Sequence, residues 1–267
     1  MTNGTTHLAI RRPSPARRRA ITEAFLGQIA EPPASSVEID AGRHRVGFKF
    51  ESEIRFGPPY YRARVEGPNA LSLNEFLKDR FFFLGGSPYH SELDWFAFEE
   101  ILEVPAGPSL LHFFDFSSGD LIFSLKEGGY GFSAWRPRST EAILHRLVDI
   151  RRLSWYAMDP RNPNPRYLTT GGTSAYLGSD GTYLVVLDPR AFFVALVDAS
   201  SGKLLDWKTN KDFAGFTSNP ETLQAVSFRA EENCLQVLLN WRGTESRKRT
   251  LNCDAVLEID VEARAAE

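Results

Sequence analysis

Short apolar runs separated by turn residues make up most of the chain, and one such unit occurs twice. The first copy begins with the letters DFSSGDLI at residues 115–122, and the second with DASSGKLL at residues 198–205. The copies stay in register without a gap, because seven residues of the first meet an identical residue 83 positions later. These are Asp115, Ser117, Ser118, Gly119, Leu121, Pro137 and Ala142. Self-similarity at one fixed spacing indicates a duplicated structural unit.

The Asp-x-Ser-Ser-Gly segment predicts a tight turn in each copy. Asp and Ser side chains cap backbone N–H groups, and Gly adopts the positive φ that a tight reversal needs. Aromatic and β-branched runs precede the turns at residues 110–114 and 192–197, and apolar residues follow them. Each turn therefore closes a β-hairpin. In the second copy residues 183–188 add a third strand, and residues 95–98 stand in the matching place of the first.

Alternating apolar and polar positions predict strands elsewhere in the chain, at residues 37–39, 43–50, 61–65 and 251–261. Residues 142–159 fit either a helix or two strands. The duplicated stretch after Ala225 reads as strand, turn and strand, so we favour strands in both copies. Residues 159–166 contain three prolines and two asparagines, which predict a surface loop at the boundary between the copies.

Two short helices are predicted before the first copy. In residues 15–30 the apolar side chains Ile21, Phe25 and Ile29 recur every four positions, which gives a narrow apolar stripe. Residues 71–80 are expected to form the second helix, capped by Ser72 or Asn74.

The duplicated unit resembles the blades of WD40-like and quinoprotein-like β-propellers. In those blades a strand follows a Ser-x-Asp-Gly-type turn, here Ser179-Asp180-Gly181, and the next strand ends in Asp-x-x-Ser/Thr-Gly-Lys, here residues 198–203. Trp207 stands where those blades carry a tryptophan, whereas the first copy has Ser124. The resemblance covers about half of the chain and implies four-stranded antiparallel blades of about 40 residues. Two repeats then make about four blades, which leaves a closed ring and an open set of sheets as alternatives.

We therefore expect a mainly β protein of antiparallel meander sheets with an internal duplication, β-propeller-like and either complete or incomplete, with a short N-terminal helix. Residues 1–35 are expected to form a mobile basic arm and that helix. Residues 36–267 are expected to form a single mainly-β domain with repeats at about residues 91–165 and 179–260. Deleting residues 1–19 would then leave the fold and the melting temperature nearly unchanged.

Composition supports a folded, water-soluble chain. Of 267 residues 42% are hydrophobic and 20 are Phe, which supplies a substantial core. No apolar run approaches 18 residues and no secretory h-region follows the first charges, so neither a membrane span nor a signal peptide is expected. Cys234 and Cys253 are too few for a disulfide framework, which favours the cytoplasm and leaves one bridge between them open.

The charge of the chain is unevenly distributed. The net charge of −3 comprises +4 in residues 1–30 and −7 in the remainder. A short basic segment of this kind is typical of a solvated helix start, so we expect no nucleic-acid partner. An acidic body suits a basic protein partner, because opposite charge speeds diffusional encounter.

Catalytic motifs are missing from the sequence. It contains no phosphate-binding Gly-x-x-x-x-Gly-Lys loop, no Gly-x-Ser-x-Gly elbow and no His-Glu-x-x-His, so we lean away from an enzyme and expect no cofactor. The alternative is a loop-built or metal site around His90, Glu92 and Asp94, which project to one side of an extended chain. A zinc site needs three or four ligands, and no matching cluster occurs elsewhere.

By elimination, the sequence favours a non-catalytic protein-binding module. The segment RFGPPYY at residues 55–61 resembles one found in uncharacterised bacterial proteins of the immunity type, which pair it with a later propeller-like strand. From elimination and the acidic composition we expect a cytoplasmic bacterial protein that neutralises a toxin. Candidate contact residues are aromatic and acidic side chains near loops, namely Tyr60, Tyr61, Glu92, Asp94, Trp95, Tyr130, Trp135 and Trp207. A structural subunit of a larger assembly is the further alternative.

Overall fold

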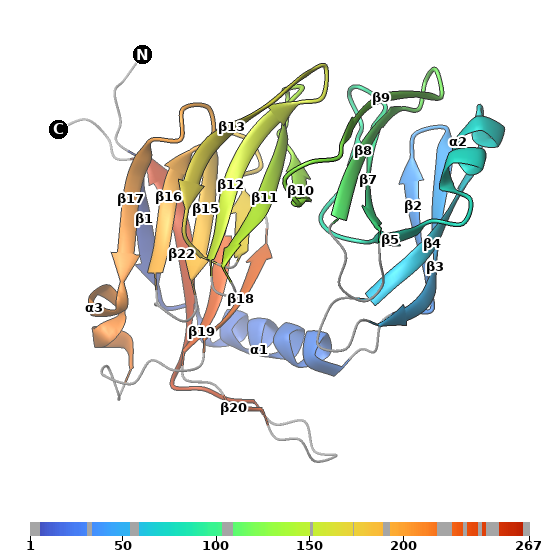
Figure 1. Cartoon of the computed structure of the whole chain (residues 1–267). Helices are drawn as coiled ribbons and strands as arrows, with labels where there is room; N and C mark the ends of the chain where they lie inside the picture. Colours follow the sequence, from blue (N-terminus) through green and yellow to red (C-terminus); the bar gives the residue numbers. More distant parts are fainter. Residues whose placement is uncertain are drawn as a thin grey trace. The chain divides into compact units, whose positions relative to one another are not determined.

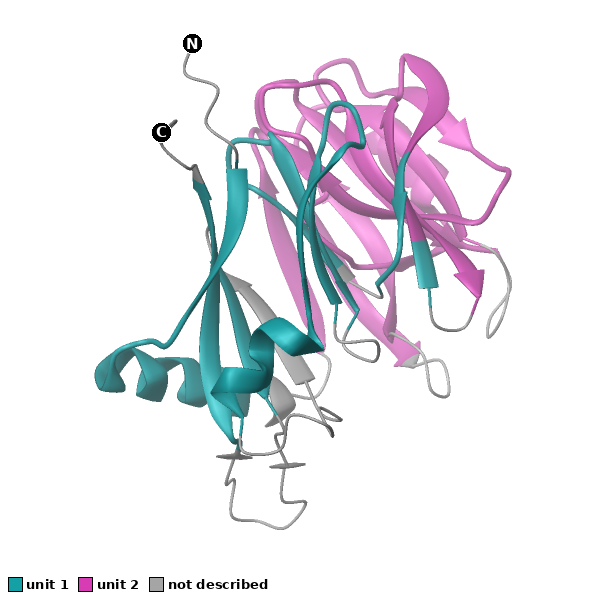
Figure 2. Cartoon of the chain, turned by 90° about the vertical axis from the view of Figure 1, so that its left-hand side faces the viewer, with its two compact units in different colours: residues 1–31, 151–153, 168–267 teal, residues 32–150, 154–167 magenta. Residues whose placement is uncertain are grey.

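The computed structural model confirms a mainly β fold of antiparallel sheets with few helices (Figure 1). It describes residues 6–30, 34–53, 59–102, 109–149, 152–172, 174–188, 193–217, 226–231, 234–239, 242–243 and 251–263. The chain divides into two compact units (Figure 2). Unit 1 comprises residues 1–31, 151–153 and 168–267, and unit 2 comprises residues 32–150 and 154–167.

Unit 2 contains an eight-stranded sheet built from the aromatic-rich part of the chain. Its strands, in sheet order, are β2 (Ser36–Ala41), β3 (His44–Glu53), β4 (Pro59–Glu66), β5 (Phe81–Phe83), β7 (Trp95–Ile101), β8 (Ser109–Asp115) and β9 (Asp120–Leu125), with β6 (Tyr89–His90) paired to β7. Helix α2 (Ala70–Leu77) buries Leu73 and Leu77 in the core of this sheet. Phe96 and Phe116 stack there with ring centroids 5.1 Å apart.

The cap of α2 differs from the prediction. Asn69 occupies the N-cap position with φ 57° and makes no side-chain cap bond. Asn74 instead bonds the backbone of β4, accepting from Val65 N at 2.8 Å and donating to Val65 O at 2.7 Å. An Asn side chain offers both a donor and an acceptor, and here it satisfies a strand and not a helix end.

A four-stranded meander follows, with strands in the order β10 (Tyr130–Trp135), β11 (Ala142–Asp149), β12 (Arg152–Asp159) and β13 (Asn162–Thr170). The prediction of strands in residues 142–159 is confirmed. The predicted loop at residues 159–166 is wrong, because Asn162 onward forms β13. This strand lies at the edge of its sheet, where proline is tolerated because the missing N–H has no ladder partner to lose.

Unit 1 contains two further four-stranded sheets. One is the meander β14 (Ser174–Leu177), β15 (Tyr183–Asp188), β16 (Phe193–Asp198) and β17 (Leu204–Thr209). The other has the order β1 (Thr6–Arg11), β22 (Ala255–Ala263), β19 (Cys234–Leu239) and β18 (Val226–Glu231). The short elements are α3 (Asn210–Phe213), the 3-10 turn Ala214–Phe216 and the ribbon β20 (Arg242–Gly243) with β21 (Leu251–Asn252). Cys234 and Cys253 are both free thiols, so no bridge joins them.

The N-terminal segment is not the mobile arm that the sequence suggested. Strand β1 pairs along its whole length with β22, from Thr6 opposite Ala263 to Arg11 opposite Glu258. Leu8 is buried in the core of unit 1, and helix α1 (Pro15–Ala30) buries Ile21 and Phe25. Deleting residues 1–19 would remove this ladder and the first five residues of the helix, so a loss of stability is expected.

The two copies of the repeat form hairpins with the same turn and matching strand register, which confirms the two predicted hairpins. Gly119 and Gly202 have φ 82° and 75°, and each donates its N–H at 2.8 Å to the carbonyl of the Asp that opens the turn. In each hairpin the register shifts at one place, leaving Ile122 unpaired in β9 and Leu205 in β17. These two residues are 83 positions apart, so even the β-bulge is duplicated.

Candidate functional site

Three of the predicted contact residues are buried and therefore unavailable to a partner. Tyr61, Trp95 and Trp135 are 4%, 0% and 8% exposed, because they lie on strand faces that pack into the cores of unit 2. Trp135 also uses its only polar atom, since Nε1 donates to the carbonyl of Pro88 at 2.8 Å. These aromatic residues build the fold, and their assignment to an interface is corrected accordingly.

Two further predicted residues are half-buried. Tyr60 packs edge-to-face on Phe81 at 5.4 Å between ring centroids. Tyr130 contacts Tyr156 in the same way at 5.1 Å, and the guanidinium of Arg146 lies 5.8 Å from its ring centroid. Both rings are thus mainly engaged with neighbours of their own unit.

The proposed metal ligands do not converge. The ring Nε2 of His90 bonds the carbonyl of Ser139 at 2.7 Å, and Asp94 accepts the hydroxyl of Tyr89 at 3.0 Å. Burial of Tyr89, together with this carboxylate, raises the pKa of the phenol to about 12. Glu92 is exposed. Across the described ranges no three His, Cys, Asp or Glu side chains are placed to hold a metal ion.

A pocket of about 200 Å³ nevertheless forms beside His90. One wall is the segment around β6, and the other is the end of β10 with the turn that follows it. Three contacts join the two walls. They are an isolated bridge between Ser87 and Ala134, the hydrogen bond from Trp135 to Pro88, and the hydrogen bond between His90 and Ser139. The lining residues are Ser87, Tyr89, His90, Ser91, Glu92, Ala134, Trp135, Arg136, Pro137 and Arg138.

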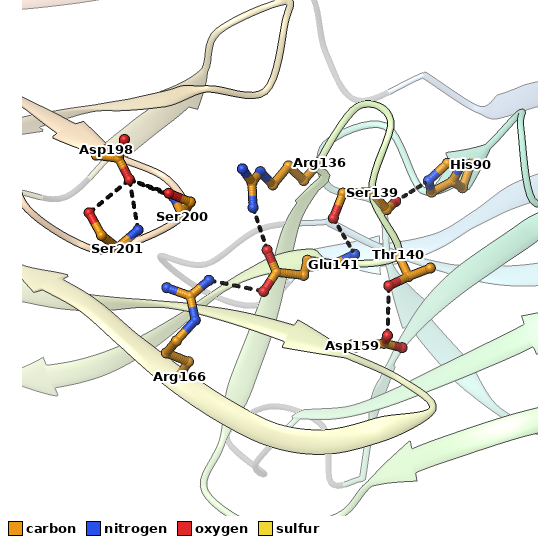
Figure 3. A network of polar contacts seen from close by, with 10 residues as sticks. All are labelled: His90, Arg136, Ser139, Thr140, Glu141, Asp159, Arg166, Asp198, Ser200 and Ser201. Carbon is orange, nitrogen blue, oxygen red and sulfur yellow. Dashed lines mark hydrogen bonds and ion pairs between the residues drawn. The ribbon is translucent and has the colours of Figure 1, made fainter.

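Polar contacts hold the turn between β10 and β11 in place (Figure 3). Glu141 accepts Arg136 at 2.6 Å and Arg166 at 2.9 Å through its two carboxylate oxygens. Thr140 donates to Asp159 at 2.6 Å. Because Asp159 lies on β12 and Arg166 on β13, the turn that forms this pocket wall is fixed to two strands of its sheet.

The remaining predicted residue, Trp207, lies on the surface. It is 57% exposed on β17, the edge strand of its sheet, and Leu204 and Leu205 beside it are 52% and 37% exposed. The β-bulge explains why two successive leucines are exposed, since the extra residue interrupts the usual alternation of faces. We call Leu204, Leu205 and Trp207 the β17 strip.

A buried polar row was missed by sequence reasoning. His112 bonds Ser124 Oγ through Nδ1 and Glu100 Oε2 through Nε2, both at 2.7 Å, and Arg80 donates to the same Glu100 oxygen at 2.5 Å. Burial would raise the pKa of Glu100, but the hydrogen bonds from His112 and Arg80 outweigh it and lower that pKa. Each partner lies on a different strand or loop, so only the strand order could have revealed the row.

Comparison with known proteins does not assign the chain to a family. No family model matches it, and no curated protein matches it in sequence. Solved structures with similar strand arrangements include the WD40 domain of Toxoplasma gondii coronin, at 10% identity over 86% of this chain and 56% of that chain, with TM-score 0.41. TolB from Acinetobacter baumannii has 13% identity over 84% and 53%, with TM-score 0.41.

A third similar structure is the hypothetical selenium-binding protein from Sulfolobus tokodaii, at 9% identity over 84% of this chain and 66% of that chain, with TM-score 0.46. The chain thus spans less than two thirds of the length of these proteins. Within the described residues no helix is long and apolar enough to cross a membrane.

Proposed function

We propose that this chain is a non-catalytic protein-binding module and that the β17 strip is its main contact surface. The observation that carries the proposal is the 57% exposure of Trp207 next to two exposed leucines on an edge strand. Tryptophan is enriched among residues that dominate binding energy at protein interfaces. The part of a tryptophan ring that stays in water contributes nothing to folding, whereas a partner can bury it.

The repeat supports this reading, because Trp207 is not needed to build the hairpin. The first copy makes the same turn and the same bulge with Ser124 at the position of Trp207. An exposed aromatic ring in only one of two matching hairpins is therefore an addition to the fold. Binding of a partner supplies a reason for it.

Charge suggests the kind of partner. Residues 31–267 carry a net charge of −7, which would steer a basic protein toward the module. Neutralisation of a basic toxin in a bacterial cytoplasm is one specific form of this proposal. Lys203 and Lys211, which flank the strip in the sequence, are exposed. The net negative charge of the rest of the chain would therefore act in encounter, and the apolar strip in retention.

The test is a capture experiment from native cell extract with the full chain as bait. Trp207→Ser gives the second hairpin the residue of the first, and Leu204→Ser removes a leucine of the strip. Leu121→Ser is the matched control, because Leu121 is the counterpart of Leu204 and is itself 44% exposed. We expect Trp207→Ser to reduce capture of one protein at least about tenfold, as truncation of a hot spot typically costs about 2 kcal/mol.

Two outcomes bear on the details. Capture that weakens steeply with salt supports a basic partner, and capture that is insensitive to salt contradicts it. Equal capture by wild type, Trp207→Ser and Leu121→Ser would overturn the proposed surface. Turnover of a small molecule without any captured protein would overturn the module itself in favour of an enzyme.

A further inference from the structure

We propose that the pocket between β6 and the β10–β11 turn binds a free α-amino acid as a zwitterion. The two walls of this pocket belong to unit 2, and three contacts join them: the Ser87–Ala134 bridge, Trp135 to Pro88 and His90 to Ser139. A pocket whose walls are already fixed costs a ligand little ordering. The proposal is independent of the β17 strip, which lies in unit 1.

His90 supplies a hydrogen-bond acceptor at the pocket. A carbonyl oxygen can only accept, so Nε2–H is the donor in the bond to Ser139, and Nδ1 of the neutral ring is then an acceptor. The residue as a whole is only 5% exposed, but Nδ1 is not among the buried polar atoms without a partner, and no described residue bonds it, so this atom is open to the pocket. An open acceptor at the pocket wall can accept a hydrogen bond from a ligand N–H group.

Two opposite charges line the same pocket without being paired. Glu92 and Arg138 are both exposed, and neither forms an ion pair with the other or with any other described residue. Arg136, by contrast, is neutralised by Glu141 at 2.6 Å. The ammonium group of the ligand would therefore bind Glu92 and Nδ1 of His90. Its carboxylate would bind the guanidinium of Arg138, which offers a planar pair of donors.

The backbone conformation of Arg138 also supports a ligand site at this turn. Arg138 has φ 56°, a left-handed conformation that is unfavourable for a residue with a Cβ atom. Glycine would occupy this turn position without strain. Strained residues of this kind cluster at ligand sites, where the side chain is retained for its chemistry.

The volume of the pocket limits the size of the ligand. Pockets for drug-sized molecules are typically about 300–1,000 Å³, and this one is about 200 Å³. One amino acid fits such a volume, whereas a nucleotide or a cofactor does not. Its apolar part would lie toward the Trp135 side of the lining.

The test measures the melting temperature of the full chain with each common L-amino acid at millimolar concentration, followed by titration calorimetry of the best one. We expect at least one amino acid to raise the melting temperature by about 2–4 °C. Its N-acetyl and amide derivatives, which lack the ammonium or the carboxylate, should give no shift. No shift from any amino acid, or equal shifts from both derivatives, would overturn the proposal.

Variants separate binding from folding. Glu92→Gln and Arg138→Gln should each weaken the affinity about tenfold. Arg138→Gly should abolish the ligand-induced shift while the free protein melts at the same or a higher temperature, because the backbone strain is relieved. Asp79→Gly is the control, since Asp79 also has positive φ, at 61°, but lies outside the pocket. Retention of binding by Arg138→Gly would contradict the assigned role of the guanidinium.

Discussion

The hairpin β8–β9 of unit 2 and the hairpin β16–β17 of unit 1 have the same backbone but different uses. Both have an Asp-x-Ser-Ser-Gly turn and a bulge at the same place. At one cross-strand pair they differ completely: His112 faces Ser124 in the first, and Ala195 faces Trp207 in the second. The first pair belongs to a buried polar row, and the second places an aromatic ring on the surface.

The comparison shows that the residues that set the turn and the strand register are not the residues that decide which side chains the hairpin buries or exposes. Asp115 and Asp198 each accept the N–H groups of the two serines that follow, so the turn is satisfied locally in both copies. Nothing in that turn constrains the pair several residues away. Divergence at the pair was therefore free to produce a polar core in one copy and a candidate contact surface in the other.

The largest expected effect is from breaking the polar row. His112→Ala removes both hydrogen bonds of a side chain that is 2% exposed and leaves a cavity against Phe76, whose ring lies 4.9 Å from the imidazole. We expect a loss of about 2–4 kcal/mol in the free energy of unfolding. Chemical denaturation monitored by tryptophan fluorescence measures it. A change below about 0.5 kcal/mol would show that the row is dispensable.

The turn glycines should give the next largest effect. A Cβ atom on Gly202 would lie 2.7 Å from the backbone carbonyl oxygen of Leu168, and on Gly119 it would lie 2.7 Å from Cβ of Asn69. Both positions also have positive φ. We expect Gly202→Ala and Gly119→Ala each to cost about 1–3 kcal/mol, because neither contact can be relieved by a change of side-chain rotamer. Melting temperatures equal to that of the wild type for either variant would refute this reasoning.

Acid should weaken the first hairpin through Glu100. Its folded-state pKa lies below its ordinary value of 4.5, so its ionised form stabilises the fold above that value, and this contribution is lost as the pH falls through the folded-state pKa. Burial raises the pKa of Glu99 and opposes the trend, so the informative quantity is the difference between wild type and Glu100→Gln. We expect that difference to shrink below about pH 4. A difference that stays constant with pH would contradict the ion-pairing of the row.

The smallest expected effect on stability is from Trp207→Ser. Removal of a side chain that is 57% exposed should change the free energy of unfolding by less than about 0.5 kcal/mol. The same denaturation experiment measures it beside His112→Ala. A loss above about 2 kcal/mol would mean that Trp207 serves the fold, and would remove the basis for the proposed contact surface.

The sequence predicts the repeated hairpins well because their turns depend on local chemistry, in the Asp, Ser and Gly residues themselves. It misses β1, whose one fully buried residue, Leu8, gives too little apolar pattern, and β13, whose prolines suggest a loop. Which aromatic residues are buried could not be predicted from the sequence. Trp95 and Trp207 both lie on strands, and only the packing of neighbouring sheets buries one and exposes the other.

The pocket was still less accessible to sequence reasoning. His90 and Glu92 were singled out, but as metal ligands, because an extended chain places them on one side. Their actual neighbours come from a turn more than 40 residues away, through the carbonyl of Ser139 at sequence separation 49. Backbone carbonyls carry no residue-specific signal, so contacts of this kind appear only in three dimensions.

The central claim, that the second hairpin holds a protein partner, is tested most directly by photo-cross-linking in the native cells. A photoreactive amino acid at position 204 samples the β17 strip, and the same residue at position 121 samples the matching site of the first hairpin. The account predicts one cross-linked protein from position 204, lost when Trp207 is also replaced by Ser, and none from position 121. Identical products from both positions, or none from either, would contradict it.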